Sequence, residues 1–447
     1  MKRLRNKRGM SRRGFFVGAA SAACGLVALP RPVRAAALGL GGRAAPSETI
    51  TVGAIGVGPR GNAVLGGFLR EADCRVLAVC DVKKWAREKT CRRVNQHYRA
   101  AVCREYNDFR DLLDRKDIDA VLSATCDHWH VLTALAAVRA GKDVYLEKPM
   151  GLSLQECWTL QEACHRYGRV FQFGTQQRSD AKFRLACELV RNKKIGKLHT
   201  INVWSPGSAS GGSFERVPVP EGLDYDMWLG PAPYTPYTKG RCSNRLWWFI
   251  SDYALGFIAG WGIHPVDIAV WGAADLIDCP VEIEGTGVFP REGVADTAMN
   301  WRITLKYESG IRLNFAGSPR PQEWTQRYQR TTSHGTAFEG AEGWVHVNRG
   351  VVNSSPPSLV KTTFGPGDVR LYRSPGHVRN FLDCIKSRKR AVAHIDDAVR
   401  SETICHISNI AILLGRKLRW DPAARRFTND SEANHLLTRA MREPWHL

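Results

Sequence analysis

The sequence has 447 residues, which is enough for two or three domains, and its hydrophobic fraction of 44% is that of an ordinary globular protein. The formal net charge is +21, but residues 1–45 hold ten Lys or Arg and no acid, which leaves +11 for the remainder. No basic tract stands beside interleaved aromatics, so we expect no nucleic-acid partner; a solvated basic surface or an anionic substrate accounts for the charge. The thirteen cysteines are irregularly spaced without a C-x-x-C pair, so we predict neither a disulfide framework nor a metal site.

Residues 1–45 read as a targeting segment rather than as part of the fold. Arg12-Arg13 precede Gly14-Phe15-Phe16, an apolar run follows over residues 17–29, and Val33-Arg34-Ala35 offers an A-x-A-like cleavage position. The pattern resembles a twin-arginine export signal, which implies a periplasmic protein that folds before it crosses the membrane. The run is too short to span a bilayer, so we expect no stable membrane anchor, although a lipid anchor at Cys24 is an open alternative.

A glycine-rich turn follows the first apolar strand, which we expect over residues 50–55. The turn reads Gly56-Val57-Gly58-Pro59-Arg60-Gly61, a G-x-G-x-x-G pattern that leads into a helix over residues 62–69. Glycines at these positions allow a tight turn and let backbone N–H groups approach a pyrophosphate. A second strand over residues 74–80 ends in Asp81, about 20 residues beyond the glycines, where a carboxylate suits the ribose hydroxyls of NAD.

We therefore predict an NAD site that contains Gly56, Gly58, Arg60, Gly61 and Asp81. The carboxylate of Asp81 would repel the ribose phosphate of NADP. Because Lys83 and Lys84 could reach such a phosphate, NADP remains an alternative.

Strands and helices alternate up to residue 173. We expect helices over residues 83–98, 107–116 and 131–140, a helix from a Ser153/Glu156 capping box to about Tyr167, and strands over residues 118–124, 143–146 and 170–173. Short connections between such elements favour a doubly wound parallel sheet that binds ligands at the carboxyl ends of its strands.

Three segments together resemble the glucose–fructose oxidoreductase/inositol dehydrogenase (Gfo/Idh/MocA) family: the glycine turn, the run Thr125 to His130 (TCDHWH), and Glu147-Lys148-Pro149. The resemblance implies an α/β protein with an N-terminal Rossmann domain over residues 46–174. It also implies a C-terminal α+β domain with an open, mainly antiparallel sheet over residues 175–447.

The resemblance places NAD(P) at the glycine turn, with Thr125, His130 and Glu147 beside it. It makes Lys148 a catalytic or substrate-orienting residue that also faces the cofactor. A lysine at the carboxyl end of a strand points into the cofactor crevice, where burial lowers its pKa towards the working pH.

The start of the second domain holds the candidate substrate contacts. Gly174 to Arg178 resembles the crossing between the family's domains, and we expect Arg178 to meet a sugar hydroxyl or carboxylate, with a salt bridge at the helix start as the alternative. The aromatic-rich stretch 205–245 continues to Tyr253 and Trp261, which we expect to hold a sugar ring beside His264.

The run Gly260 to Asp267 resembles the family's G-x-H-x-x-D segment, which lies on a helix that lines the substrate pocket. The resemblance makes His264 the base that takes a hydroxyl proton, and Asp267 shares its helical face. Many family dehydrogenases carry an aspartate four residues before this histidine, where this chain has Gly260. The usual Asp–His pair is therefore incomplete, and Asp252 or Asp267 are the candidates to replace the missing acid.

The rest of the chain predicts the second sheet. We expect strands over residues 197–204, 281–289, 299–307, 311–315 and 344–347, helices over 180–191, 377–386 and 397–414, and a loop over 349–374. Alternation of apolar and polar residues over 299–307 indicates an antiparallel sheet with one packed face. As the family's fold implies, the polar face is free to form a homo-oligomer interface.

These features predict an exported NAD(P)-dependent oxidoreductase that acts on a hydroxyl of a sugar, glycoside or cyclitol. Little free NAD exists outside the cytoplasm, so the cofactor should be held tightly. One alternative keeps the fold but uses retained NAD for transient oxidation, elimination and re-reduction, which cleaves a glycoside without net redox change. Gly260 favours that alternative, whereas the intact Glu147-Lys148-Pro149 opposes it. A non-catalytic sugar-binding protein is the third possibility.

Overall fold

The computed structural model describes residues 45, 48–243 and 245–447. The predicted export signal, up to its expected cleavage position at Ala35, and the alternative lipid anchor at Cys24 lie outside these residues. Within the described ranges, no helix has both the length and the apolar character needed to cross a membrane.

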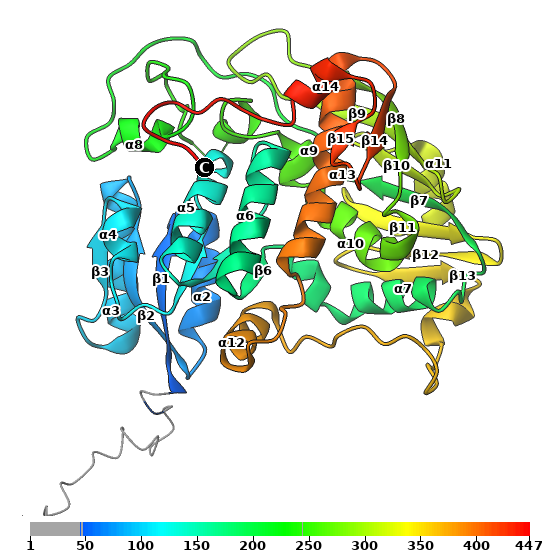
Figure 1. The fold of residues 1–447 in the computed structure, drawn as a ribbon, viewed down its shortest axis with the longest axis horizontal. Helices are drawn as coiled ribbons and strands as arrows, with labels where there is room; N and C mark the ends of the chain where they lie inside the picture. Colours follow the sequence, from blue (N-terminus) through cyan, green and yellow to red (C-terminus); the bar gives the residue numbers. More distant parts are fainter. Residues whose placement is uncertain (1–44, 46–47, 244) are drawn as a thin grey trace, which may run out of the picture. The chain divides into compact units, whose positions relative to one another are not determined.

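The first sheet is parallel and has six strands in the order β3-β2-β1-β4-β5-β6 (Figure 1). The strands are β1 (Ile50–Ile55), β2 (Cys74–Cys80), β3 (Arg104–Tyr106), β4 (Ala120–Ser123), β5 (Asp143–Leu146) and β6 (Phe171–Phe173). β4 and β5 are buried along their whole length, as their continuous apolar runs predict. The strand order reverses between β1 and β4, and in such sheets the crevice at that switch point binds the ligand.

The helices of this half are α2 (Pro59–Leu69), α3 (Lys84–Tyr98), α4 (Phe109–Leu113), α5 (Asp127–Arg139) and α6 (Leu154–Tyr167). The predicted capping box is present, because Ser153 and Glu156 each bond to the other's backbone N–H. α5 begins at Asp127, four residues earlier than predicted, so His128 and His130 lie in its first turn. The four residues from Asp127 to His130 are all buried, and this packing keeps them helical.

The second sheet has nine strands in the order β13-β12-β11-β7-β10-β9-β8-β14-β15, and all pairs are antiparallel except β7 with β10. The strands are β7 (Leu198–Trp204), β8 (Val281–Val288), β9 (Asn300–Tyr307), β10 (Arg312–Ala316), β11 (Gly335–Gly340), β12 (Gly343–Val347), β13 (Val352–Ser355), β14 (Leu418–Asp421) and β15 (Arg426–Phe427). The expected loop over residues 349–374 is wrong in part, since it contains β13 and the short helix η7 (Pro357–Lys361).

Helices α7 (Ala181–Arg191), α10 (Ile263–Ala273) and α13 (Ile395–Leu414) pack on this second sheet, and α11 (Gln322–Tyr328) packs against Trp204 of β7. α13 contacts both β8 and α6, so it lies between the two sheets (Figure 1, orange). One large cluster of buried apolar residues draws on both halves of the chain, and a separate cluster lies around β1 and α2. Nine of the twelve described cysteines are buried.

The helix α12 (His377–Ser387) returns to the first half of the chain, where it packs against α2. The ring of Phe381 lies 6.2 Å from that of Phe68 and 5.9 Å from that of Tyr145. Arg379 on the same helix pairs with Asp73 at 2.6 Å. The N-terminal core is therefore completed by residues beyond the predicted division at 174/175.

Candidate functional site

The three glycines of the turn have different roles. Gly56 has a φ of +78°, and a Cβ there would lie 2.6 Å from the backbone of Ala124 and Thr125. A Cβ on Gly61 would lie 2.0 Å from the carbonyl oxygen of Gly56, so the close approach of α2 to β1 requires glycine there. A Cβ on Gly58 would meet nothing within 4 Å, and Gly58 lines a cavity. The turn therefore leaves open space where a pyrophosphate would lie against the backbone.

The cavity beside this turn has a volume of about 700 Å³, which is within the range of small-molecule and cofactor sites. Its wall brings together eight of the nine predicted cofactor residues: Gly56, Gly58, Arg60, Asp81, Thr125, His130, Glu147 and Lys148. Five tryptophans also line it: Trp85, Trp129, Trp228, Trp247 and Trp248. The residues present therefore fit a dinucleotide, because its flat rings can pack against tryptophan side chains. The contact of each residue with NAD remains a prediction.

Asp81 holds the glycine turn in place. Its carboxylate accepts the backbone N–H of Val57 at 2.9 Å and that of Lys83 at 2.9 Å. Burial raises the pKa of Asp81, and each carboxylate oxygen keeps a lone pair for a ribose hydroxyl. Lys83 Nζ donates to the carbonyl of Cys242 at 2.7 Å, so this lysine is already bound and is a poor candidate to hold the phosphate of NADP.

Lys148 lies just beyond the carboxyl end of β5, as predicted. Its Nζ donates to the carbonyl oxygen of Gly260 at 2.5 Å. Gly260 ends the short helix α9 (Phe257–Gly260), and a carbonyl at a helix end lacks an intrahelical partner. Burial lowers the pKa of Lys148, while the carboxylates of Glu147 and Asp127 oppose this shift.

Glu147 connects the lysine to the glycine turn. Its buried carboxylate accepts from Arg60 at 2.7 Å and from Gln176 at 2.8 Å. His130 holds Pro149, the residue after Lys148, because its Nδ1 lies 2.5 Å from the carbonyl oxygen of Pro149. Glu147 and His130 therefore hold the backbone on both sides of Lys148.

His264 lies in the first turn of α10 and is almost fully buried. Its Nδ1 has no hydrogen-bond partner in the part of the chain that the structure describes. Burial, followed by the positive charges of Lys148 and Arg349, holds the pKa of His264 well below its ordinary value. The imidazole is therefore neutral near pH 7 and able to accept a proton.

Neither Asp252 nor Asp267 replaces the aspartate that many family dehydrogenases carry at the position of Gly260. Asp252 pairs with Arg439 at 3.4 Å, and Asp267 pairs with Arg178. A side chain at position 260 would fit, because the nearest atom to its Cβ would be a ring carbon of Phe257 at 3.5 Å. The position is thus open, and its backbone carbonyl binds Lys148.

Asp127 is a site residue that the sequence analysis missed. It is 2% exposed, and its Oδ2 has no hydrogen-bond partner among the described residues. Burial raises the pKa of Asp127 well above its usual range, and the charge of Lys148 opposes this shift. Asp127 stands at the N-terminus of α5, inside the TCDHWH run, and that position could have marked it as facing the crevice.

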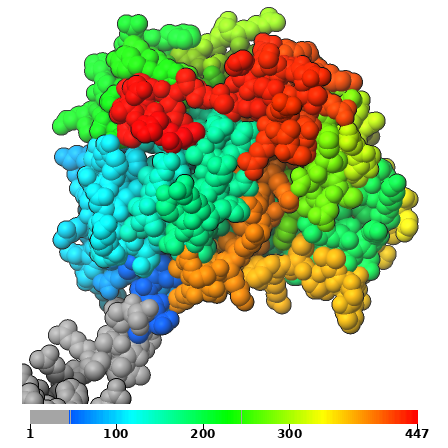
Figure 2. Space-filling model, in the orientation of Figure 1, coloured from blue at the N-terminus to red at the C-terminus, as the bar shows by residue number. Residues whose placement is uncertain are grey.

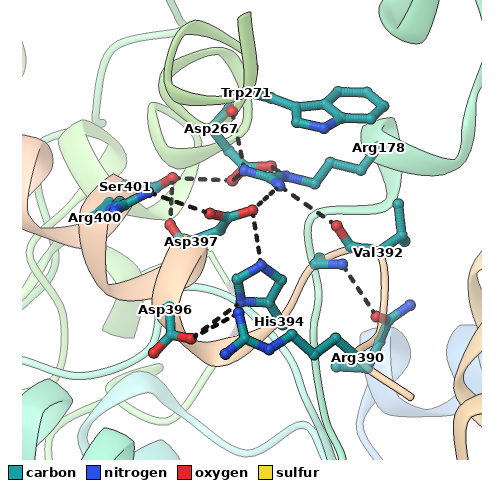
Figure 3. A network of polar contacts seen from close by, with 12 residues as sticks. Arg178, Asp267, Trp271, Arg390, Val392, His394, Asp396, Asp397, Arg400 and Ser401 are labelled. Atoms are coloured by element: carbon teal, nitrogen blue, oxygen red, sulfur yellow. Dashed lines mark hydrogen bonds and ion pairs between the residues drawn. The ribbon is translucent and has the colours of Figure 1, made fainter. Parts of the chain in front are cut away.

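The structure contradicts the prediction that Arg178 and Asp267 contact substrate (Figure 3). Both side chains are 1% exposed, and they form a two-point ion pair with distances of 2.7 and 2.8 Å. A second carboxylate, from Asp397 on α13, lies 2.5 Å from the guanidinium. The pair therefore joins α10 and α13 inside the protein, because both partners use their polar atoms on each other.

Tyr253 is likewise not placed to contact a substrate. It is fully buried, and its hydroxyl accepts from Arg241 at 3.1 Å. Trp261 keeps its predicted place beside His264, with 5.5 Å between the two ring centroids. Within the described ranges, no group of three or more His, Cys, Asp or Glu side chains is placed to hold a metal ion.

Short stretches of the chain are similar to curated hydrolases. One stretch of 125 residues is 38% identical to a "Glycosyl hydrolase family 109 protein" of Saccharopolyspora erythraea, over 27% of this chain and 27% of that protein. Another of 170 residues is 31% identical to a protein of the same name from Shewanella baltica, over 35% of this chain and 37% of that one. The matches thus span between about a quarter and two fifths of these relatives' lengths.

Solved structures share the fold over most of the chain. GenD2 from gentamicin A biosynthesis, in complex with NAD, gives a TM-score of 0.61 at 17% identity, covering 85% of this chain and 98% of that one. The aldose-aldose oxidoreductase from Caulobacter crescentus, complexed with glycerol, gives a TM-score of 0.59 at 16% identity, covering 83% of this chain and 100% of that one.

Two family models together span nearly all of the described chain. The model "Oxidoreductase family, NAD-binding Rossmann fold" matches residues 50–175, where the parallel sheet and the glycine turn lie. The model "Oxidoreductase family, C-terminal alpha/beta domain" matches residues 199–447, which is more than half of the sequence. The chain belongs to the Gfo/Idh/MocA oxidoreductase family and has an NAD-binding Rossmann domain at its N-terminal end.

Proposed function

We propose that this protein oxidises a hydroxyl-bearing carbon of a sugar, glycoside or cyclitol. The observation that carries the proposal is that Lys148, which lines the cavity, is bonded close to the buried histidine His264. Lys148 lines that cavity and bonds to Gly260, four residues before His264, and its charge acts on the imidazole. When bound, NAD supplies the hydride acceptor.

Each of the two residues has a defined task in this proposal. Lys148 donates a hydrogen bond from Nζ to the substrate oxygen, which orients the hydroxyl and polarises it. His264 accepts the hydroxyl proton on its neutral ring, so that the carbon can lose its hydride and become a carbonyl. Glu147 and His130 are positioning residues, because their bonds hold the backbone on the two sides of Lys148.

The pH dependence of kcat/KM tests the role of His264. A base must be unprotonated, and burial together with nearby positive charge lowers the pKa of His264. The acid limb of the profile should therefore lie below pH 6.5, the ordinary value for histidine. A limb at or above pH 6.5 would contradict this assignment, and the His264→Gln variant should show no such limb in its residual activity.

We infer that the protein retains its cofactor between turnovers, because the stretch around residues 205–250 covers the cavity. The backbone N–H of Lys84 donates to Gly222 at 2.8 Å, and Lys83 Nζ donates to Cys242 at 2.7 Å. Trp228, Trp247 and Trp248 of this stretch line the cavity. Release of NAD would require these contacts to open.

The C-terminal residues lie over the covering stretch. Arg442 Nη1 donates to Asp226 at 2.6 Å, and the ring of Trp445 lies 4.6 Å from that of the cavity residue Trp129. Figure 2 shows this segment (red) against the green and cyan parts of the surface. The C-terminus therefore supports retention by holding the cover down.

The experiment is to purify the protein without added nucleotide and to extract and quantify what it holds. We expect about one NAD(H) or NADP(H) per chain, and sugars of the right class should reduce it. Arg442→Ala should lose much of the cofactor, whereas Arg416→Ala should not, because Arg416 pairs with Asp430 and Glu432 away from the cavity. Protein that holds no nicotinamide cofactor and binds none would overturn the proposed function.

A second candidate is NAD-dependent glycoside cleavage by transient oxidation, elimination and re-reduction. Two observations favour it: the covered cavity, and the short-stretch similarity to proteins named glycosyl hydrolase family 109. Cleavage of a glycoside with no net NADH would select this candidate. NADH in proportion to oxidised product would exclude it.

We further propose export by the twin-arginine signal in residues 1–35 and self-association through the polar face of the second sheet. The sequence pattern supports export. Exposed polar side chains of β8 and β9, such as the Glu284–Lys306 pair at 2.8 Å, support a wet interface. N-terminal sequencing of protein from a periplasmic fraction tests the first proposal, and its mass in solution tests the second.

A further inference from the structure

We propose that the substrate carries a carboxylate and that Arg349, held on the face of Trp261, receives this group. The inference rests on the proposed function, because it names the substrate class of the same site. An anionic substrate is also one explanation for the excess of positive charge in the sequence.

Trp261 brings Arg349 to the site. The guanidinium carbon of Arg349 lies 4.7 Å from the centroid of the Trp261 ring. The same ring lies 5.5 Å from the ring of His264 and 5.0 Å from that of His334. Trp261 is thus in contact with the proposed base on one side and with a cation on another.

Arg349 is held in place but unpaired. It stands in the turn between β12 and β13, where Asn348 Oδ1 accepts the backbone N–H groups of Gly350 and Val351 at 2.8 and 3.0 Å. Apart from its contact with Trp261, the guanidinium has no hydrogen bond or ion pair with any described residue. A side chain that is exposed and fixed at its base is suited to receive a ligand.

His334 adds a second unpartnered group at this place. It is 8% exposed, and neither ring nitrogen has a hydrogen-bond partner among the described residues. His334 precedes β11, which is tied to α10 by a bond of 2.7 Å from Thr336 Oγ1 to the carbonyl of Pro265. A buried polar group without a partner is costly, so a hydrogen-bonding ligand would stabilise it.

The charges around the site leave a surplus of positive charge. Arg60, Lys148 and Arg349 act on one another and on His264. The carboxylate of Glu147 is already taken by Arg60 and Gln176. Asp127 is buried beside Lys148, and its raised pKa favours the neutral form. An incoming anion would relieve this repulsion.

A carboxylate matches the geometry of a free guanidinium. Arginine offers two parallel N–H donors to the two oxygens of a carboxylate, and such charged pairs are stronger than neutral ones. A neutral sugar would leave Arg349 without an acceptor. The expected substrate is therefore a sugar acid or a glycoside of one.

The test compares methyl glucuronide with methyl glucoside, which have the same ring and differ in a carboxylate. With the NAD-loaded protein, we expect kcat/KM to be at least about tenfold higher for the acid. Arg349→Gln should remove this preference, and Arg349→Lys should keep part of it. Arg139→Gln, an exposed arginine at the far end of α5, is the matched control and should behave as wild type.

Calorimetric binding of the same two ligands separates this inference from the proposed function. If the acid binds more tightly through Arg349 but no sugar reduces NAD, the anion site stands and the oxidation proposal fails. Equal kcat/KM and equal affinity for acid and neutral sugar would overturn the inference. A stronger preference for glucose 6-phosphate that Arg349→Gln removes would overturn the assignment of a carboxylate.

Discussion

Replacing Lys148 with methionine should lower kcat for sugar oxidation by a factor of about 10²–10⁴, the usual contribution of a positioned proton donor or acceptor. Methionine has a similar length but no charge and no hydrogen to donate, so the bond to Gly260 and the polarisation of the substrate oxygen are both lost. The measurement is single-turnover reduction of the bound cofactor. Extracted NAD is quantified in the same sample, so that a slower reaction is separated from an emptier site.

Lys142→Met is the matched control, because Lys142 is a buried lysine just before the opposite end of β5. Its Nζ donates to the carbonyls of Arg115 and Ile118, both at 2.7 Å, and it does not line the cavity. This variant should lose stability and keep the rate per bound NAD. A Lys148→Met protein that oxidises sugar at the wild-type rate would instead point to another catalytic group, and a wild type without turnover would favour a sugar-binding protein.

The nucleotide half could be predicted from the sequence because its signals are local. The glycine turn, the strand that ends in Asp81 and the capping box at Ser153 can each be recognised from a short run of residues, although Asp81 makes its contact with Val57, 24 residues earlier in the chain. Lys148 could be placed for the same reason, since it directly follows a short apolar strand that only a parallel sheet buries on both faces. These elements need no knowledge of the rest of the chain.

The second half could be predicted less well because its contacts are distant in sequence. β11 has glycine at both ends and no clear alternation, and it is a strand only because it pairs with β7 and β12. Arg349 falls in a stretch that reads as a loop, and the register of these strands brings it to Trp261. Asp397 belongs to a helix far along the chain, so its pairing with Arg178 could not be expected.

Replacing Arg178 with methionine should lower the free energy of unfolding by about 3–5 kcal/mol, as expected when one partner of a buried ion pair is removed. Its guanidinium lies between the carboxylates of Asp267 on α10 and Asp397 on α13 (Figure 3). The variant leaves Asp267 without its cation and leaves Asp397 with only His394 at 3.3 Å and Arg400 at 3.9 Å. Denaturant unfolding at neutral pH measures the loss. Arg92→Met is the control, because it breaks an exposed pair with Glu88 on α3 and should cost under about 1 kcal/mol.

The pH dependence distinguishes lost charge pairing from lost packing. Burial raises the pKa of Asp397, but Arg178, His394 and Arg400 together outweigh burial and hold the pKa below its usual range. This carboxylate therefore contributes stability above its unfolded pKa and loses it as the pH falls through the folded pKa. In Arg178→Met the Asp397 carboxylate should take up its proton at higher pH than in wild type, so the difference in unfolding free energy between variant and wild type should narrow as the solution is acidified. Adding Asp267→Asn to the variant should also narrow the difference in unfolding free energy from wild type at neutral pH. If neither low pH nor the second substitution changes this difference, Arg178 acts through packing against Trp271 alone.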